Sequence, residues 1–594
     1  MSDTLLLISI GPVQDFIASA RKLRDLWVGS RMLSEFSKTV ARTLAENGAD
    51  LIFPAPERME ELVNGSELIV ANKILVSVNS PEEADRIQQE ARQAWQAHFN
   101  SLGESTRSVL ESEFNQISIN LNVFDAELRD YGEFYAAWTP IAESYQDARA
   151  RVESLLAARK NFRAFKAPEW NGFKTPKSSL DGMRESVFME KPHEIIGLLK
   201  RNEHLDAIGC IKRFGFLAKG VENKYFSDLA EMALIPWIIG AENGDISHID
   251  LIEKFQNSFP DKIKVCRGKR LTVGNLSLNV DAEKFFSDRA KLDELYGNNA
   301  KNIWDCRDEM FKKYGKPSPY SVIMVGDGDH MGEMIRSIPN KEMHKQFSRK
   351  LSNFSNSVAT IVEEAGGSLI YAGGDDIMSY LPLHTAVMCA DEIRKRFHSE
   401  MKSLCESIGL NVNIAATFSI GLAIVHYMHP LDLALELARK AEFIAKESGR
   451  NSLAVIQSKR AGAEVIVHGK WDADGDLPGI AERLKYICSM YSSESQLLPS
   501  KLGYDLKRVK IATGGNSEME FAAVDGDIRP ENVTAVLVRR VFDQKNQGDI
   551  EKNKQLRELL IGRKDVDQLS NELVIGRLIS QAQIMAKGKV AADE

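Results

Sequence analysis

The chain has 594 residues, a length that corresponds to several domains rather than one. Hydrophobic residues make up 43% and charged residues 27%, as is typical of a folded globular protein. The net charge of −8 argues against free, non-specific binding to nucleic acid, because neutralising phosphates requires a basic surface. A local basic groove, or one completed by partner subunits, is compatible with this charge.

Cysteine usage and hydropathy limit the cellular setting. The six cysteines include no Cys-x-x-Cys pair, so we expect buried free thiols and no structural zinc. The first ten residues lack the pattern of a signal peptide, and the most apolar later stretch, 232–241, is about half as long as a membrane span. We therefore expect a cytoplasmic protein without membrane contact.

The first 165 residues are predicted to form a palm-like domain with a helical extension. Its expected elements are, in order, a strand at 4–10, a helix at 13–47, strands at 51–53 and 73–78, and helical spacing from 81 to about 166. Residues 166–314 mix helical periodicity with one strand-like stretch at 271–280, which predicts a mainly helical connector.

The clearest pattern lies between residues 315 and 470. The expected elements are a strand at 321–326, a helix at 331–364 broken near Pro339, strands at 368–371 and 377–381, a helix at 385–404, a strand at 412–424, a helix at 431–448 and a strand at 452–456. This order is that of the ferredoxin-like fold, which polymerase palms and nucleotidyl cyclases share. Residues 471–594 carry helical periodicity and many charges. The predicted fold class is α+β, with two palm-like domains, a helical connector and a C-terminal helical bundle.

Three acidic residues of the second palm-like domain indicate a catalytic function. Asp327 ends the first expected strand, and Asp375 and Asp376 stand at the turn of the following hairpin. Because these strands are neighbours in a ferredoxin-like sheet, we expect the three carboxylates to converge. Paired divalent cations in phosphoryl transfer need such rigidly held oxygen ligands, and hard oxygens favour Mg²⁺ or Mn²⁺.

The glycines before these carboxylates allow two interpretations. Gly373 and Gly374 would permit positive φ and leave room for a triphosphate near the backbone. The same tetrapeptide is also ordinary turn chemistry, since Gly and Asp favour hairpin tips. The flanking strands, together with Asp-Gly-Asp at the end of the preceding strand, favour the functional interpretation.

Several ordered motifs resemble the large, polymerase-like subunit of type III-B CRISPR RNA-guided effector complexes. In the second palm-like domain they are Pro317-Ser318-Pro319-Tyr320, the segment from Gly326 to Gly332, and Tyr371-Ala372-Gly373-Gly374-Asp375-Asp376. Earlier matches lie at 11–17, 21–27, 29–30, 159–163, 177–182, 184–185 and 212–213. The resemblance runs in order over about residues 5 to 460.

The resemblance implies a signalling enzyme. The family's palm joins ATP into cyclic oligoadenylates when its complex has captured a matching foreign transcript. Carried over by motif, Asp327, Asp375 and Asp376 would hold two Mg²⁺ or Mn²⁺ ions, and Gly328 and Asp329 are further candidates for nucleotide contact. The implied partners are the other subunits of the effector complex and, through them, guide RNA and target RNA.

Two further residues are candidates for ATP contact. The helix that carries Lys446 looks like the last helix of diguanylate cyclases, where a lysine meets the triphosphate; the alternative is an ordinary solvated lysine. Ser30 follows Gly29 in the first palm-like domain and would touch a second ATP across the cleft between the palms. Its alternative role is helix packing or capping.

A basic segment is a candidate for RNA contact. Between Arg159 and Lys177 the chain carries six positive residues and one negative residue, in an otherwise acidic protein. This charge would suit guide RNA, target RNA or an acidic partner. The alternative is a solvated surface, which is the commoner fate of such a run.

The sequence departs from the family pattern at two places. Many members carry an N-terminal nuclease domain marked by a His-Asp pair, but none of the 11 histidines here precedes an aspartate. We therefore expect the form that lacks this nuclease. The family's connector often binds zinc through paired cysteines, whereas the matching stretch 174–179 contains no thiol.

The palm motif does not determine which molecule accepts the adenylate. The same carboxylates would serve an enzyme that joins AMP to another small molecule, such as S-adenosylmethionine. A silent scaffold subunit is a further alternative, although a scaffold has no need to crowd like charges. A diguanylate cyclase is disfavoured because the turn lacks that family's Glu-Phe ending. For a template-copying polymerase, we identify neither a fingers domain nor a basic template groove.

Overall fold

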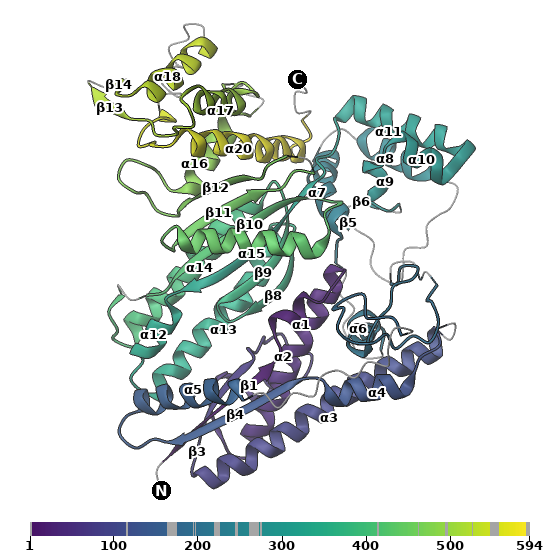
Figure 1. Cartoon of the computed structure of the whole chain (residues 1–594), viewed down its shortest axis with the longest axis vertical. Helices are drawn as coiled ribbons and strands as arrows, with labels where there is room; N and C mark the ends of the chain where they lie inside the picture. The colour runs from purple at the N-terminus through teal and green to yellow at the C-terminus, as the bar shows by residue number, and fades with distance from the viewer. Residues whose placement is uncertain are drawn as a thin grey trace.

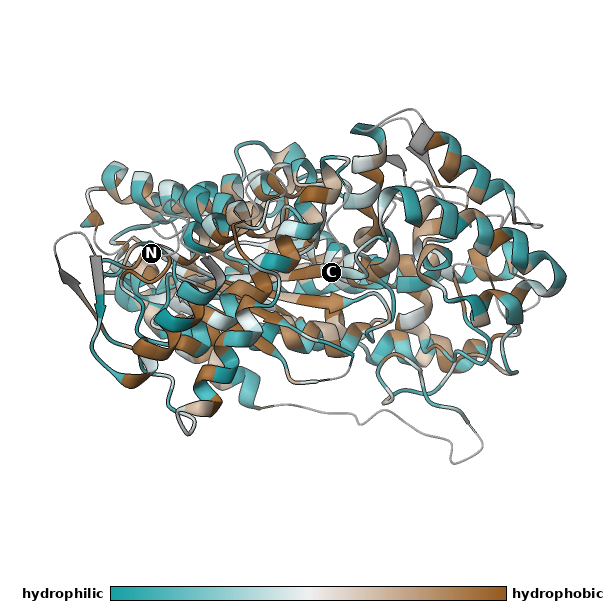
Figure 2. Cartoon of the chain, turned by 90° about the horizontal axis from the view of Figure 1, so that it is seen from above, coloured by the Kyte–Doolittle hydropathy of each residue, from teal (hydrophilic) through white to brown (hydrophobic). Residues whose placement is uncertain are grey.

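The computed structural model of the chain describes most of its length (Figure 1). The described residues are 3–114, 117–162, 175–193, 195, 198–218, 226–243, 247–259, 272–273, 276–278, 280–412, 415–460, 462–492, 497–524, 527–546 and 558–589. Hydrophobic residues concentrate along the strands and the inner faces of the helices (Figure 2). Among the described residues, no helix combines the length and the hydropathy needed to span a bilayer.

The first palm-like domain has a four-stranded antiparallel sheet in the order β2-β3-β1-β4. Its elements are β1 (Thr4–Gly11), α1 (Gln14–Ala18), α2 (Leu23–Glu46), β2 (Asp50–Phe53), β3 (Lys73–Val78), α3 (Pro81–Glu113), α4 (Leu121–Asp130), β4 (Glu133–Pro140) and α5 (Tyr145–Asn161). The β1-α2-β2-β3-α3-β4 connection with this strand order is ferredoxin-like. The predicted palm-like fold of this part is therefore confirmed.

Two local predictions in this domain were wrong. The stretch expected to be helical after residue 81 contains strand β4, which pairs with β1 along its whole length. Ala136 and Ala137 blur its alternation, so tertiary pairing overrides local preference. The helix expected at 13–47 is divided into α1 and α2, because the Asp25 carboxylate accepts hydrogen bonds from the backbone N–H groups of Arg21 and Lys22 and caps a new helix.

The second palm-like domain has a six-stranded sheet in the order β12-β11-β10-β7-β9-β8. Its elements are β7 (Tyr320–Asp329), α12 (Met331–Ser337), α13 (Lys341–Glu364), β8 (Ser368–Gly373), β9 (Asp376–Pro382), α14 (Ala386–Ser407), β10 (Thr417–His426), α15 (Leu431–Glu447), β11 (Ser452–Gln457) and β12 (Val465–Lys470). The order β10-β7-β9-β8 is the ferredoxin-like core. The predicted element order is confirmed, and β12 is an addition that the sequence did not reveal.

Alternating residues of β7 separate the two faces of this sheet. Val322 and Met324 pack with α13 and α14, whereas Ile323 and Val325 belong to the core that includes α15 and the connector helix α7. The latter core also includes much of the first palm-like domain. Because this core is continuous, domain boundaries at residues 165, 314 and 470 remain a proposal.

The connector and the C-terminal part are mainly helical, as predicted. The connector contains α6 (Ala207–Phe214), α7 (Leu229–Asn243), α8 (Ser247–Asn257), β5 (Thr272–Val273), β6 (Leu276–Ser277), α9 (Glu283–Phe286), α10 (Arg289–Tyr296) and α11 (Ala300–Tyr314), with short 3-10 turns. The C-terminal part contains α16 (Ile480–Met490), α17 (Leu502–Ala512), β13 (Phe521–Val524), β14 (Asp527–Pro530), α18 (Val533–Asn546) and α20 (Val566–Ala586). The β13–β14 hairpin was not expected. Five cysteines are buried and free, and Cys266 lies outside the described residues.

The two palm-like domains meet through helix α13. His344 on this helix shares a 2.6 Å hydrogen bond between its Nδ1 and the hydroxyl of Tyr145 on α5, and Lys345 pairs with Asp50 at 2.7 Å. His344 is 5% exposed. Burial, followed by the positive charge of Arg149, lowers the pKa of His344 to about 3.

We expect acid to weaken this contact between the domains. An unfolded histidine takes up a proton near pH 6.5, whereas His344 stays neutral in the fold down to about pH 3. Its contribution to stability is therefore complete above pH 6.5 and is lost as the pH falls, by about 2 kcal/mol between pH 7 and pH 5. Thermal unfolding of the native chain and of His344→Gln at both pH values tests this. The native chain should lose more stability, and equal losses would contradict the expectation.

Candidate active site

The three predicted carboxylates lie at one end of the second sheet. Asp327 stands near the end of β7, and β9 pairs with β7 so that Ile377 faces Gly326. The β8–β9 hairpin closes with Gly373 opposite Asp376, which leaves Gly374 and Asp375 as the two turn residues. Asp375 and Asp376 are therefore held next to the end of β7 by hairpin geometry.

Gly328 allows the hairpin turn to approach β7 closely. A Cβ atom at this position would lie 2.9 Å from Cβ of Asp375 and 2.7 Å from Cγ of Met331. Any larger residue would displace Asp375 or Met331. Gly328 therefore allows the turn that carries Asp375 to lie close against the end of β7, and its expected contact with the nucleotide remains a prediction.

The two glycines of the hairpin differ in what they contribute. Gly374 has a φ of +81° and its carbonyl accepts a hydrogen bond from the Ser355 hydroxyl at 3.1 Å. A side chain at Gly374 would be strained and would meet Leu351 at 3.2 Å. At Gly373, by contrast, a Cβ atom would have no neighbour within 4 Å. Open space of this kind is what an approaching phosphate group needs.

We expect alanine at these two positions to have different effects. Gly374→Ala forces a non-glycine residue into positive φ, which costs about 1 kcal/mol and should accelerate amide hydrogen exchange in β8 and β9 about fivefold. Gly373→Ala is the matched control and should leave the exchange unchanged. Equal exchange in the two variants would show that turn strain does not govern this hairpin.

The carboxylates influence one another electrostatically. Burial, and then the charges of Asp327 and Asp376, raise the pKa of Asp375 to about 7. Burial also raises the pKa of Asp376 to about 6, although a 2.8 Å hydrogen bond from the hydroxyl of Tyr371 opposes the rise. Crowded acids of this kind attract a cation that relieves their repulsion.

Helix α15 supplies that cation from the protein itself. The ammonium group of Lys446 contacts Oδ2 of Asp327, and it also lies 2.6 Å from Oε1 of Glu442, one turn earlier on the same helix. Burial opposes the charge on Lys446, but hydrogen bonds to these two acids outweigh it and raise the pKa of Lys446 above its ordinary value. Lys446, the residue predicted to contact the triphosphate, is thus directed into the carboxylate cluster.

Asp329 has a different setting from the other acids. Its side chain is buried and accepts hydrogen bonds from the hydroxyls of Thr417 and Ser419 on β10, at 2.8 to 2.9 Å, and from the backbone N–H of Asn451 at 2.9 Å. These contacts use both carboxylate oxygens. Asp329 therefore fixes the loop after α15 to β7 and β10, and its expected contact with the nucleotide remains a prediction.

Ser30 and the basic segment are placed only in part. Ser30 lies half-buried on α2, a helix that contacts strand β8 of the hairpin domain, and its role towards a second ATP remains a prediction. Most of the basic segment, residues 163–174, lies outside the described residues. At its ends, Lys160 lies 6.0 Å from the ring of Tyr135, and Lys177 donates a hydrogen bond to the carbonyl of Met183. RNA contact by this segment also remains a prediction.

Two residues of the site were missed by sequence reasoning. Tyr371 orients Asp376 by a hydrogen bond, and Glu442 holds Lys446. The only sequence signals are the spacing of four between Glu442 and Lys446, which puts both on one helix face, and the position of Tyr371 in the strand that leads into the hairpin.

The donor set fits Mg²⁺ or Mn²⁺ in its chemistry. All candidate ligands are hard carboxylate oxygens, and burial together with their mutual repulsion raises the pKa values of Asp375 and Asp376. Among the described residues, no three His, Cys, Asp or Glu side chains already surround a common point. Asp327, Asp375 and Asp376 lie at the same end of the sheet, but Asp327 is turned towards Lys446.

Comparison with known proteins identifies the family. Residues 320–454 match the model of the Cas10/Cmr2 second palm domain, and residues 5–103 match that of the CRISPR-associated protein Cmr2 N-terminal region. Both matched regions are regions of the Cas10/Cmr2 family. This confirms the resemblance to the large subunit of type III-B complexes that the motifs indicated.

Individual relatives of this chain are distant in sequence. The CRISPR system Cmr subunit Cmr2 of Pyrococcus furiosus is 25% identical over 567 residues; the alignment covers 79% of the chain and 63% of the relative's length. The solved type III-B Cmr-beta complex bound to cognate target RNA contains a chain with a TM-score of 0.62 and 13% identity, with coverage of 96% and 82%. A chain in the apo state of the Cmr-beta complex has a TM-score of 0.61 and 14% identity. The alignment covers 98% of the present chain and 82% of that chain. These likenesses support the two-palm α+β fold.

Proposed function

We propose that this chain is the nucleotidyl transferase of a type III-B CRISPR effector complex and joins ATP into cyclic oligoadenylates when the complex binds target RNA. The observation that carries the proposal is the arrangement of Asp327, Asp375 and Asp376 at one strand end, with Lys446 directed among them. A scaffold would gain no stability from such crowding of like charges. The family membership supplies the biological setting.

The proposed metal ligands are Asp327, Asp375 and Asp376, which would hold two Mg²⁺ or Mn²⁺ ions. Bound there, these ions would neutralise the triphosphate and lower the pKa of the attacking hydroxyl. Tyr371 keeps the Asp376 carboxylate in one orientation by its 2.8 Å hydrogen bond. The hairpin keeps Asp375 beside β7, whereas Asp327 would have to exchange Lys446 for the metal ions.

The chain's other residues would bind and orient the nucleotide. The open space beside Gly373 admits a phosphate group near the backbone, and Lys446 is the proposed cation for the triphosphate. Asp329 fixes the loop that follows α15 and thereby the end of the helix that carries Lys446. Ser30, on the helix α2 that contacts β8, is the proposed contact for a second ATP.

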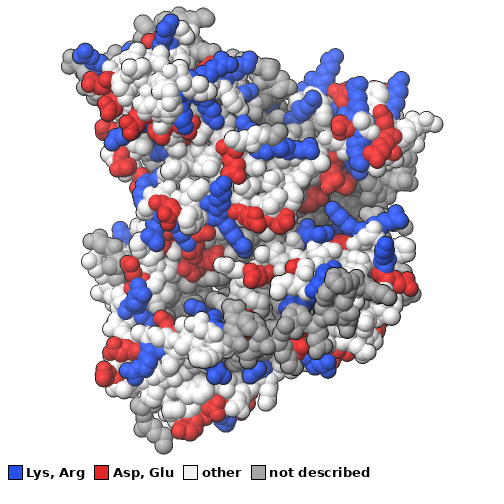
Figure 3. Space-filling view, viewed as in Figure 1, with Lys and Arg blue, Asp and Glu red and all other residues white. Residues whose placement is uncertain are grey.

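The proposed partners are the other subunits of the complex and, through them, guide RNA and target RNA. Lys and Arg are interspersed with Asp and Glu over the surface seen in Figure 3, which does not resemble a continuous basic groove. Together with the net charge of −8, this supports RNA recognition that depends on partner subunits. The proposed place of action is the cytoplasm.

The test is to identify the product. The assembled complex is incubated with labelled ATP, Mg²⁺ or Mn²⁺ and matching target RNA, and the products are analysed by mass spectrometry. Cyclic oligoadenylates that appear only with matching RNA would support the proposal. AMP joined to another small molecule would replace the proposed product, and the absence of any nucleotidyl transfer would favour a scaffold.

A further inference from the structure

Lys446 is shared between two carboxylates that come from different elements. Its ammonium contacts Asp327 at the end of β7 and Glu442 on its own helix, at 2.6 Å from the latter. The side chain of Glu442 is 17% exposed and that of Lys446 is 28% exposed, so the pair is only partly solvated. One cation therefore holds a proposed metal ligand and a residue that no motif assigns to the site.

We propose that Lys446 is an internal counter-cation that competes with divalent metal for Asp327, and that Glu442 positions the lysine so that it passes from Asp327 to the triphosphate. This inference rests on the proposed function. The Asp327 carboxylate is required by both cations, so each weakens the binding of the other. Lys446 balances the crowded acids before the metal ions bind.

Glu442 makes the transfer possible because it shares a helix with Lys446. The two residues are four positions apart, so their contact persists when the bond to Asp327 is broken. Of the two carboxylates that contact Lys446, only Asp327 would remain if Glu442 were replaced. Lys446 would then bind Asp327 more tightly. Glu442 also lies close enough to Asp376 to raise its pKa, which places it at the edge of the cluster.

The backbone around the pair is fixed, so the proposed movement belongs to the lysine side chain. Asp329 ties the backbone N–H of Asn451, just beyond α15, to the end of β7. Ala441 and Ala445 on the same helix pack against Ala454 and Ile456 of β11. A side-chain rotation over a fixed helix is a small change that ligand binding can drive.

The test measures Mn²⁺ affinity of the full-length chain by electron paramagnetic resonance without nucleotide. Lys446→Met should bind Mn²⁺ about fivefold more tightly, because a competitor is removed. Glu442→Gln should bind it about threefold more weakly, because Lys446 then remains on Asp327. The double variant should bind Mn²⁺ within about twofold of Lys446→Met, since Glu442 acts mainly through the lysine and its charge on Asp376 is a smaller effect. Lys440 lies on the same helix and pairs at 2.6 Å with Glu464, which directly precedes β12; Lys440→Met is therefore the matched control and should change nothing.

The outcomes separate this inference from the proposed function. Unchanged Mn²⁺ affinity in Lys446→Met overturns the counter-cation while leaving a metal-binding palm intact. Weaker binding by Glu442→Gln in both backgrounds would make Glu442 a direct ligand and also overturns the inference. Native binding that Asp327→Asn and Asp375→Asn leave unaffected would defeat the proposed function as well.

Discussion

Replacing Asp375 and Asp376 together with asparagine should lower ATP turnover by the assembled, RNA-bound complex at least about a thousandfold. Asparagine preserves the size of both side chains and suits the hairpin turn, so the fold should persist. What is lost is the negative charge that the proposed metal ions require. Turnover of labelled ATP under saturating target RNA provides the measurement.

The matched control for this experiment is Asp391→Asn. Asp391 lies on α14, which packs on the opposite face of the sheet from α15, and pairs with Arg394 at 2.8 Å. Its replacement should leave turnover within about twofold of the native value, because it removes only partly exposed pairs with Arg394 and Lys395 on the same helix. Equal activity of the double variant and this control would remove the hairpin carboxylates from the chemistry.

A second large effect is expected on stability, at Arg213. Its guanidinium is 1% exposed, donates to the Asp25 carboxylate at 2.7 and 2.8 Å, and pairs with Glu203 at 3.1 Å. Although burial alone would raise the pKa of Asp25, the Arg213 charge lowers it below its ordinary value. Arg213→Met would leave two buried acids without this partner and should reduce the free energy of unfolding by about 3–5 kcal/mol.

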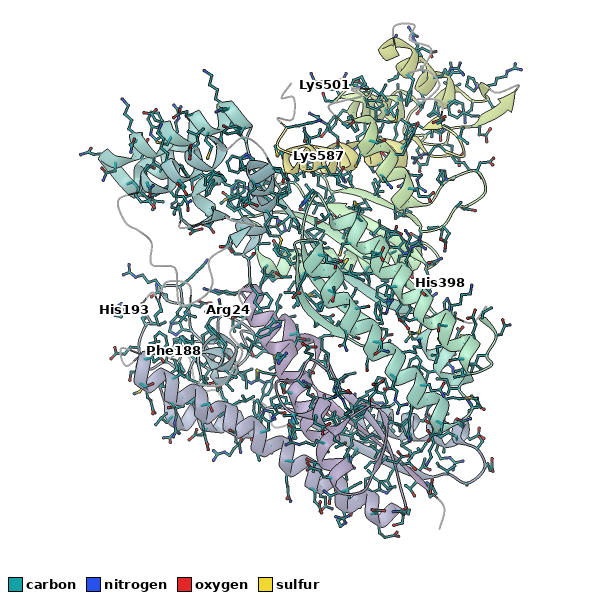
Figure 4. The ribbon with its side chains drawn as sticks, turned by 180° about the vertical axis from the view of Figure 1, so that it is seen from behind. Arg24, Phe188, His193, His398, Lys501 and Lys587 are labelled. Carbon is teal, nitrogen blue, oxygen red and sulfur yellow. The ribbon has the colours of Figure 1, made fainter. Side chains whose placement is uncertain are left out.

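Denaturant unfolding of Arg213→Met tests this expectation. Arg86→Met is the matched control, because Arg86 is 52% exposed and forms a surface pair with Glu90, whose loss should change stability by less than about 1 kcal/mol. Similar losses in the two variants would show that the buried network is not a stabilising centre. The network fixes the start of α2, where Arg24 packs over Phe216 and lies beside the connector (Figure 4).

The second palm-like domain could be predicted well because each of its elements is long and regular. The apolar run 321–326 and the hairpin around residue 374 define the neighbouring strands, and the ferredoxin-like order then fixes which strand ends meet. Strand β4 could not be predicted, because its two alanines favour helix and only pairing with β1 decides its conformation. The strands of the β13–β14 hairpin have only four residues each and carry no strong alternation.

In the candidate site, the features that follow from backbone topology could be predicted, and those that depend on side-chain contacts could not. The meeting of Asp327 with the hairpin follows from strand order alone. Asp329 stands only two residues later, but the chain turns at His330, which has a φ of +60°, and the Asp329 carboxylate is captured by hydroxyls of β10. The contacts of Tyr371 and Glu442 depend on how a hairpin and a helix pack, which no local pattern encodes.

The most direct test of the carboxylate site is anomalous diffraction from crystals of the protein grown with Mn²⁺ and a non-hydrolysable ATP analogue. Manganese peaks about 2.1 Å from carboxylate oxygens of Asp327, Asp375 and Asp376, with the triphosphate beside Gly373, are the predicted result. Manganese and nucleotide bound elsewhere, with these three side chains uncoordinated, would contradict the account.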